Sequence, residues 1–363
     1  MLTPFDDYPI HQTSHPLAHA GGGHPDYYDR FWFHGYSEEM YFSVALGVYP
    51  NRGVIDAAFS VVHDGVQRSV FASGRMPVDR TQTQIGPISI EIIEPLRVNR
   101  IRVDAPEHGL LADLVATART PACEEVQALA HGGTRLVVDY VRAAQMVVYS
   151  GALSSGGSSV GLAGRPVYGT KDRSWGIRPV GDPAPAAPGS ELTQFFFLWA
   201  PLNFDDVCLH YMTMENSAGE SFGQTAALLP VIDTGGVVFG DDTGIRHLKQ
   251  IEHRVRWAEG RRRSAGATLV LPKDAGTSDT VELEPVSGLT FRMQGAGYFH
   301  PRWAHGRWHD ELAVGGEAHP VEELDTPDCF HVQQVMRAKW GTRAGLGVLE
   351  QIVIGPYAPA GFG

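Results

Sequence analysis

Short alternating runs of apolar and polar residues, each closed by a turn signal, constrain this chain more than any other feature. Between Met40 and Val48 every second residue is apolar, which predicts a half-buried β-strand. Asn51-Arg52-Gly53 then predicts a turn, and Asp64-Gly65 is a dipeptide typical of a tight two-residue hairpin. Similar short runs continue to Val348–Ile354 at the spacing of roughly 8–12 residues expected of β-barrels and sandwiches.

Long amphipathic helical patterns are hard to find in this chain. The best one is Val137–Val148, whose apolar residues can share a helical face, although its β-branched and aromatic residues fit a strand equally well. Gly151–Gly164 is rich in glycine and predicts a flexible hairpin loop. The 42 glycines and 24 prolines among 363 residues suit a chain with many turns. We therefore predict an all-β protein.

Charge and cysteine content exclude several classes of protein. The net charge of −12 argues against a nucleic-acid-binding surface, which needs a concentrated positive face. The three cysteines lie far apart, which indicates neither a disulfide framework nor a cysteine-based zinc site. No membrane-spanning apolar run and no nucleotide-binding or hydrolase motif is present, so we expect a cytoplasmic protein that needs no cofactor.

The length of 363 residues favours two domains. Residues 1–30 are rich in His, Pro, Gly and Asp without periodicity, and predict an irregular lead-in. Judged by composition alone, the Pro-rich run Gly181–Ser190 would be a linker between the domains.

A first cluster of candidate functional residues lies in Gly169–Pro179, where Asp172, Arg173, Trp175 and Arg178 fall within a few positions. In a strand, Asp172 and Trp175 face opposite sides. One interpretation is structural, an Asp–Arg ion pair with the indole packed at a barrel rim. The other is functional, a carboxylic acid in an aromatic cavity whose pKa is raised by desolvation so that it exchanges protons at neutral pH.

A second cluster spans Tyr298–Asp310. Its aromatic and titratable members are Tyr298, His300, Trp303, His305, Trp308 and His309. The spacing of the histidines suggests a metal site, but Pro301 and Gly306 break any helix that would align the imidazoles. A ligand pocket lined by aromatic rings, with one histidine as base or hydrogen-bond donor, is favoured over metal binding, and ordinary structure is the remaining interpretation.

The third cluster is Asp29–Glu39, which contains His34 and Tyr36 after a dense aromatic run. Its simplest interpretation is a buried aromatic cluster that opens the first strand. The alternative is that His34 and Tyr36 contribute to a substrate-binding surface.

The segment GTKDRSWGIRP, followed by the aromatic run Phe195–Ala200 and by FDD before Val207–Met214, resembles the tandem lipocalin-like superfamily. That superfamily includes carotenoid 1,2-hydratase (hydroxyneurosporene synthase), kievitone-hydratase-type proteins and lipocalin-like Diels–Alderases. The segments DRFWFHGYSEEMYFSVALGVYPN, WAHGRW and GLGVLEQIVIGPY are similar to an uncharacterised bacterial branch.

The resemblance implies two consecutive lipocalin-like antiparallel β-barrels with little helix and a ligand cavity near their interface. On that mapping the domains are residues 1–220 and 221–363, and Gly181–Ser190 becomes a loop of the first barrel. The resemblance also places Asp172 at the position of a carboxylate that protonates an alkene.

These observations predict a cofactor-independent acid/base enzyme acting on a hydrophobic small molecule of terpenoid, steroid or aromatic type. The expected chemistry is that of a hydratase or dehydratase, or of an isomerase or cyclase. Asp172 would be the acid, and Trp175 would stabilise developing positive charge through its π face. His305 or His309 would orient water or serve as base. The other expected substrate contacts are Trp175, Arg178, Tyr298, His300, Trp303, Trp308, His34 and Tyr36. The rival hypothesis is a non-catalytic lipocalin-like carrier of an apolar ligand, and a homodimer is compatible with either.

Overall fold

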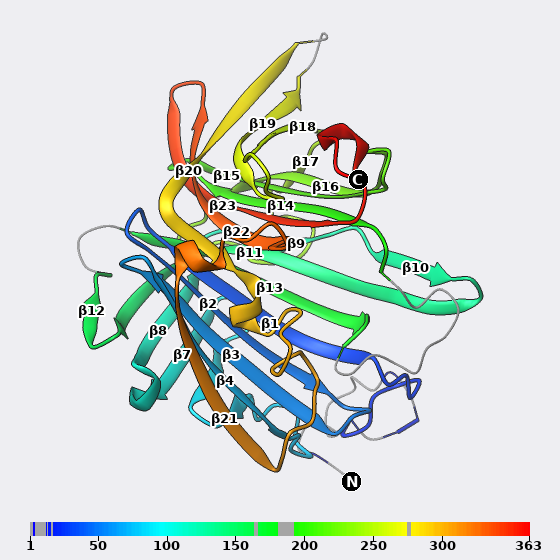
Figure 1. The fold of residues 1–363 in the computed structure, drawn as a ribbon, viewed down its shortest axis with the longest axis vertical. Coiled ribbons are helices and arrows are strands. Elements are labelled where there is room, and N and C mark those ends of the chain that lie inside the picture. Colours follow the sequence, from blue (N-terminus) through cyan, green and yellow to red (C-terminus); the bar gives the residue numbers. More distant parts are fainter. Residues whose placement is uncertain are drawn as a thin grey trace.

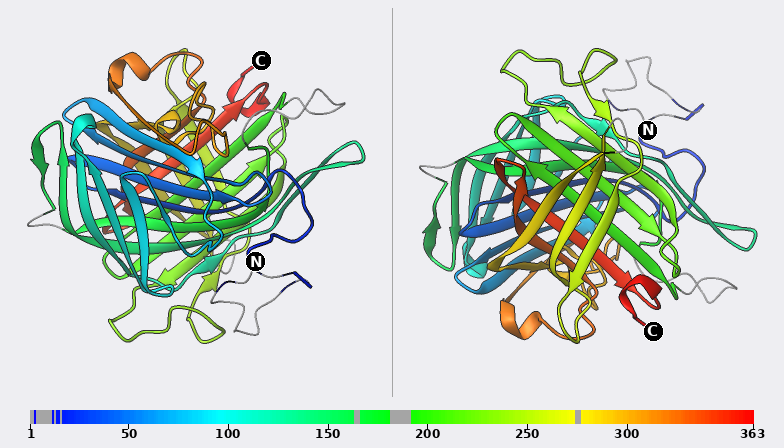
Figure 2. Two further views of the ribbon diagram at one scale, coloured as in Figure 1. Left: turned by 90° about the horizontal axis from the view of Figure 1, so that it is seen from below. Right: turned by 90° about the horizontal axis from the view of Figure 1, so that it is seen from above.

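The computed structural model describes residues 3, 12, 14–15, 17–162, 166–180, 192–273 and 277–363. Within them the chain forms two curled antiparallel sheets, of 14 and 9 strands, joined by turns and by 3₁₀ helices of three or four residues. The predicted all-β class is thereby confirmed. Figure 1 shows the second sheet packed above the first, and Figure 2 shows its strands running at an angle to those below.

The first sheet follows the order β21-β4-β3-β2-β1-β13-β11-β8-β7-β6-β5, and β9, β10 and β12 pair with β11 outside this path. Its strands are β1 (Tyr27–Tyr36), β2 (Met40–Tyr49), β3 (Val54–His63), β4 (Val66–Arg75), β5 (Gln84–Ile85), β6 (Ile88–Glu94), β7 (Val98–Ala105), β8 (Leu110–Ala118), β9 (Cys123–Glu124), β10 (Ala128–Gly132), β11 (Arg135–Ser155), β12 (Ser158–Val160), β13 (Val167–Ile177) and β21 (Leu312–Pro320).

The second sheet follows the order β17-β16-β15-β14-β23-β22-β20-β19-β18. Its strands are β14 (Phe195–Asn203), β15 (Val207–Glu215), β16 (Ser221–Pro230), β17 (Arg246–His247), β18 (Glu252–Trp257), β19 (Ser264–Pro272), β20 (Ser278–Arg292), β22 (His331–Trp340) and β23 (Arg343–Ile354). The 3₁₀ helices are η2 (Pro106–His108), η4 (Met293–Ala296), η5 (Val321–Leu324) and η6 (Ala358–Ala360).

Each sheet curls around its own apolar core. Alternate residues of β1, Phe31 and Phe33, point into the concave side of the first sheet, where they join aliphatic side chains from β2 to β8. Leu198 and Leu209 belong to the corresponding core of the second sheet. The convex side of the first sheet is covered by the second sheet, and the layer between them contains Trp32, among other buried residues.

The strand predicted at Met40–Val48 is present as β2, but the prediction that only one of its faces is buried is wrong. All ten residues of β2 are buried, because the second sheet covers the face that the alternation would leave to water. The Asp64-Gly65 hairpin is confirmed, and both residues adopt positive φ angles, of 49° and 72°.

The ambiguous segment Val137–Val148 is part of the 21-residue strand β11. The predicted loop at Gly151–Gly164 is wrong in its first half, because β11 continues to Ser155 and turns at Gly156-Gly157 into β12. The strand β1 begins at Tyr27, inside the expected lead-in. The Pro-rich run Gly181–Ser190 lies outside the described residues.

The expected domains 1–220 and 221–363 do not coincide with the two sheets. The strands β14 and β15 precede residue 220 but pair within the second sheet, and β21 returns from the second half of the chain to pair with β4. The change of sheet along the chain therefore falls between β13 and β14, with one later crossing back.

Gly169 permits the close approach of β13 to β1. A Cβ atom at this position would lie 1.9 Å from the His34 carbonyl oxygen. The strand β13 cannot move away, because it is paired with β1 on one side and with β11 on the other. We expect Gly169→Ala to lower the free energy of unfolding by about 1–3 kcal/mol, measured by urea denaturation. Gly161→Ala is the matched control, because nothing lies within 4 Å of its added Cβ, and an equal loss in both variants would contradict the steric explanation.

Candidate functional site

The convex face of the first sheet is unusually polar for a buried surface. Arg30 and His34 project from β1 toward the second sheet, and Thr170, Asp172 and Ser174 project from the neighbouring strand β13. Arg30 pairs with Ser174 and His34 with Thr170 in the strand register, so these side chains form a continuous grid. The two sheets thus enclose a layer that combines ionisable groups with aromatic rings.

Asp172 lies near the middle of this layer and is 7% exposed. Burial raises the pKa of its carboxyl group to about 7, even though Arg142 and Arg178 favour the ionised form. Its Oδ2 lies 3.7 Å from Nη1 of Arg142, and its buried Oδ1 has no hydrogen-bond partner among the described residues. A carboxyl group with this pKa exchanges protons at neutral pH.

Glu125 holds the neighbouring part of the layer together. Its carboxylate accepts hydrogen bonds from Nε of Arg142 at 2.6 Å and from the indole nitrogen of Trp199 at 2.8 Å, and its Oε1 lies 2.9 Å from Nε2 of His210. Burial alone would raise the pKa of Glu125, but Arg142 and His210 lower it to about 2. Two neighbouring carboxyl groups therefore differ in protonation, Glu125 being ionised while Asp172 is close to half-protonated at pH 7.

His34 is completely buried, and burial lowers its pKa to about 3, so its imidazole is neutral. Its ring packs against Tyr36, Tyr41 and Trp199, with centroids 5.5 to 5.9 Å apart. Neither of its ring nitrogens has a hydrogen-bond partner among the described residues. A neutral imidazole in this state offers one donor and one acceptor to a bound molecule.

His34 and Asp172 are not isolated cases. Six residues that face the layer carry a buried polar atom without a described hydrogen-bond partner: Arg30, Trp32, His34, Asp172, His210 and His331. An unsatisfied buried polar group costs roughly 1–3 kcal/mol, and native proteins bury only a few per hundred residues. These groups are concentrated on the layer between the two sheets.

Tyr298 forms the wall of the layer beside β1. Its ring lies 4.4 Å from the His305 ring, 5.0 Å from the His331 ring and 6.0 Å from the Trp32 ring. The guanidinium groups of Arg30 and Arg178 lie 4.5 and 5.6 Å from its centroid. This ring links the second predicted cluster to the first and third.

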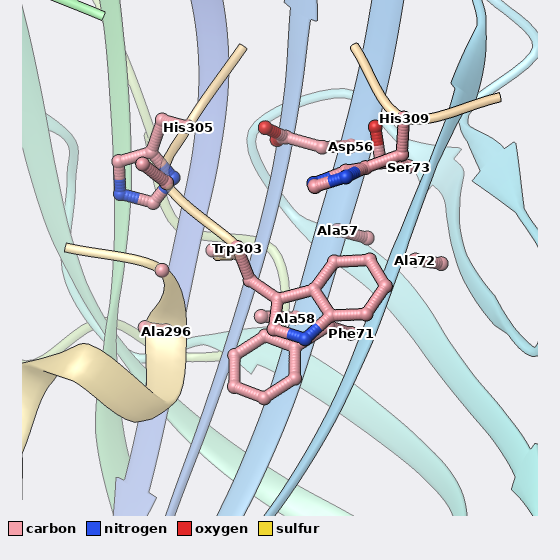
Figure 3. A pocket seen from close by; sticks show the side chains of 13 residues that line it. Asp56, Ala57, Ala58, Phe71, Ala72, Ser73, Ala296, Trp303, His305 and His309 are labelled. Atoms are coloured by element: carbon pink, nitrogen blue, oxygen red, sulfur yellow. The ribbon is translucent and has the colours of Figure 1, made fainter. Parts of the chain in front are cut away.

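The segment that carries Tyr298 continues across β3 and β4 (Figure 3). Asp56 of β3 anchors it by accepting hydrogen bonds from the Gly306 backbone N–H, at 2.6 Å, and from the Tyr49 hydroxyl, at 3.1 Å. Burial raises the pKa of Asp56 to about 6. The small cavity beside it, lined by His305 and His309, has a volume of about 10 Å³, roughly enough for one water molecule.

The structure thus brings together only part of the predicted site. Six of its residues face the inter-sheet layer: His34, Tyr36, Asp172, Arg178, Tyr298 and His305. Trp175 points to the opposite side of β13 from Asp172 and is 41% exposed, so it cannot stabilise charge there. The rings of Trp303 and His309 lie against each other beside β3 and β4, tilted by 51° with centroids 4.7 Å apart.

Two more members of the second cluster also lie away from Asp172. His300 packs on Phe71, with its Nε2 3.0 Å from Oε1 of Glu317, and Trp308 is exposed beside Arg75. In the described part of the chain no group of three or more His, Cys, Asp or Glu side chains has the geometry to hold a metal ion.

Sequence reasoning missed Trp32, Glu125, Arg142 and Trp199. The alternation of Arg30, Trp32 and His34 with Phe31 and Phe33 is a signal for Trp32, because it marks a strand with one aromatic-polar and one aromatic face. Glu125 and Arg142 carry no such signal, since they meet only through the pairing of β9 and β11 and the covering strand β14.

A family model, the "Family of unknown function (DUF8625)", matches residues 2–363. The chain belongs to the DUF8625 family. No curated protein matches this DUF8625 chain. Its fold is similar to that of a candidate AttH protein from Nitrosomonas europaea, with a TM-score of 0.52, 14% identity, and coverage of 90% of this chain and 92% of that one.

A protein of unknown function from the DUF3598 family of Nostoc punctiforme matches over 90% of this chain and 95% of that chain, with 10% identity. Its TM-score of 0.12 carries no argument. The likeness to the Nitrosomonas protein concerns the fold alone. Among the described residues of the DUF8625 chain, no helix has the length and apolarity to cross a membrane.

Proposed function

We propose that this DUF8625 protein is a cofactor-independent acid/base enzyme that acts on a hydrophobic small molecule between its two sheets. The observation that carries the proposal is Asp172, a buried carboxyl group with an unpartnered oxygen and a pKa of about 7. His34 supports it, because a neutral imidazole without partners lies on the same grid. A terpenoid, steroid or aromatic substrate suits the surrounding Trp32, Tyr298 and Trp199.

The expected chemistry is hydration or dehydration, with isomerisation or cyclisation as the second possibility. In hydration, Asp172 donates its proton to one alkene carbon, and the other carbon becomes cationic. A water molecule then bonds to that carbon and gives up a proton to His34, which takes the role expected of His305 or His309 because neither of its ring nitrogens has a described partner. Return of that proton from His34 to Asp172 restores both groups. The indole ring of Trp32, rather than that of Trp175, would stabilise the cation through its π face. Dehydration is the same sequence reversed.

The test is turnover of a panel of apolar alkenes and alcohols, followed by gas chromatography, with wild type and Asp172→Asn. General acid catalysis contributes roughly 10²- to 10⁴-fold, so we expect Asp172→Asn to lose turnover by that factor. Asp104→Asn is a control on the exposed face of β7 and should turn over normally. Unchanged turnover in Asp172→Asn would disprove the proposed acid.

A carrier function is the competing outcome of the same experiment. Native mass spectrometry of the purified protein would then show an apolar ligand that wild type binds and releases unchanged. The cytoplasmic location and the homodimer remain predictions, which cell fractionation and light scattering of the purified chain test.

A further inference from the structure

Two arginines face the inter-sheet layer without a carboxylate partner. Arg30 is 1% exposed; its Nη1 lies 2.9 Å from Nε2 of His305 and its Nη2 3.4 Å from the Ala296 carbonyl oxygen, while its Nε is unpartnered. Arg178 lies over the rings of Tyr28 and Tyr298, 4.4 and 5.6 Å from their centroids. Within the described ranges, no Asp or Glu oxygen lies within ion-pair distance of either guanidinium group.

Other arginines of the first sheet differ in this respect. Arg142 is bonded to Glu125, and Arg173 donates to Asp29 at 2.6 Å. Arg119 is satisfied by oxygen acceptors of β14 and the turn after it. Arg30 is buried and Arg178 is partly buried. A buried cation without a bonded carboxylate is costly, so the position of Arg30 beside Arg178 needs an explanation.

Asp56 is not bonded directly to either arginine. It is near enough for Arg30 and Arg178 to lower its pKa, yet both of its oxygens accept hydrogen bonds from other groups, Tyr49 and the Gly306 backbone. Its pKa of about 6 means that Asp56 is mostly ionised at pH 7 and offsets part of the positive charge from a distance. Glu350 is a second carboxylate of this region, but its Oε1 is bonded to Nε2 of His331 at 2.8 Å. What distinguishes Arg30 and Arg178 is therefore the lack of a directly bonded carboxylate.

We propose that Arg178 and Arg30 bind a carboxylate group of the substrate, which makes the substrate class an apolar, unsaturated or hydroxylated carboxylate. Guanidinium groups suit this role because their planar donors match the two oxygens of a carboxylate. The inference rests on the proposed function, since it names the substrate class of the same site.

The register of the strands places this carboxylate close to the proposed acid. Arg30 pairs with Ser174, and Asp172 pairs with Trp32, so Arg30 and Asp172 are diagonal neighbours on β1 and β13. Diagonal neighbours are roughly 7–8 Å apart, a distance spanned by a few carbon–carbon bonds. The apolar body of the substrate would lie along Trp32, with its reactive carbon at Asp172.

The test is binding of two probe pairs, trans-cinnamate with trans-cinnamamide and octanoate with octanamide, measured by calorimetry on the full-length protein. We expect wild type to bind at least one carboxylate about tenfold more tightly than its amide, because a charge-assisted hydrogen bond is worth roughly 1.5–3 kcal/mol. Arg178→Met should abolish this preference, and Arg178→Lys should keep part of it. Arg173→Met is the matched control on the opposite face of β13 and should retain the preference.

Circular dichroism of every variant checks that it folds. Comparing Arg178→Met with Arg178→Lys separates loss of the positive charge from loss of the fold. The inference is overturned if wild type binds neither carboxylate more tightly than its amide, or if the preference survives in Arg178→Met. Asp172→Asn should keep the preference while losing turnover. If it keeps both, the proposed acid fails while the anion site stands, so the two failures are distinguishable.

Discussion

Glu125→Gln will lower the free energy of unfolding by about 3–5 kcal/mol. Its side chain is 1% exposed and compensates Arg142 while bonding His210 and Trp199. Removing one partner of a buried ion pair leaves the other charge buried and uncompensated, and this is the costly kind of change. Urea denaturation at pH 7 measures the effect.

The pH dependence of this variant follows from the lowered pKa of Glu125. A carboxyl group whose folded-state pKa lies below its unfolded value stabilises the protein above about pH 4, and this contribution is lost as the pH falls toward 2. The deficit of Glu125→Gln should therefore shrink in acid. Glu284→Gln, which removes an exposed partner of Arg256 2.5 Å away, should cause no measurable loss at any pH. Equal losses in the two variants would refute the argument.

Asp172→Asn will have the opposite effect on stability at alkaline pH. Burial raises the pKa of Asp172 to about 7, against an unfolded value of about 4. Between these values the folded state holds a proton that the unfolded state has released, so the wild-type protein loses stability as the pH rises from about 4 to about 7. Asparagine cannot ionise, and three pKa units correspond to about 4 kcal/mol. At pH 8 the variant should exceed wild type by up to about that amount.

Thermal or urea denaturation of wild type and Asp172→Asn between pH 4 and pH 8 measures this difference, which should vanish toward pH 4. Asp113→Asn is the control, because Asp113 forms an exposed ion pair with Arg100 at 2.6 Å and its pKa is lowered. A stability difference for Asp172→Asn that does not change with pH would contradict a raised pKa. Together with lost turnover, the expected gain would mean that the acid is kept at a cost in stability, as is common for catalytic groups.

The candidate site was predictable where local pattern decides it. In Gly169–Pro179 the period of two puts Asp172 and Trp175 on opposite faces of a strand, and the structure has them there. The role expected of Trp175 does not follow, because only the covering sheet determines which face becomes an enclosed layer. In Tyr298–Asp310 the residues point several ways, since the segment has no regular period and its course depends on the Asp56 anchor.

Trp32 and His34 show the same division. Their alternation with Phe31 and Phe33 is legible in the sequence, but the expected buried aromatic cluster does not reveal that His34 has no hydrogen-bond partner among the described residues. That property depends on the rings that pack against the imidazole. Trp199 comes from β14, far along the chain, and Tyr41 comes from the neighbouring strand β2.

The sequence by itself determined the short strands and the Asp64-Gly65 hairpin, because the side-chain period and the φ angles of a turn are local properties. Only the tertiary structure decided that β2 is buried on both faces, that β14 and β15 join the second sheet, and that Glu125, Arg142 and Asp172 meet. Burial of a second face and the pKa of a carboxyl group depend on which other part of the chain packs against them. The alternation of residues within one strand does not specify that other part.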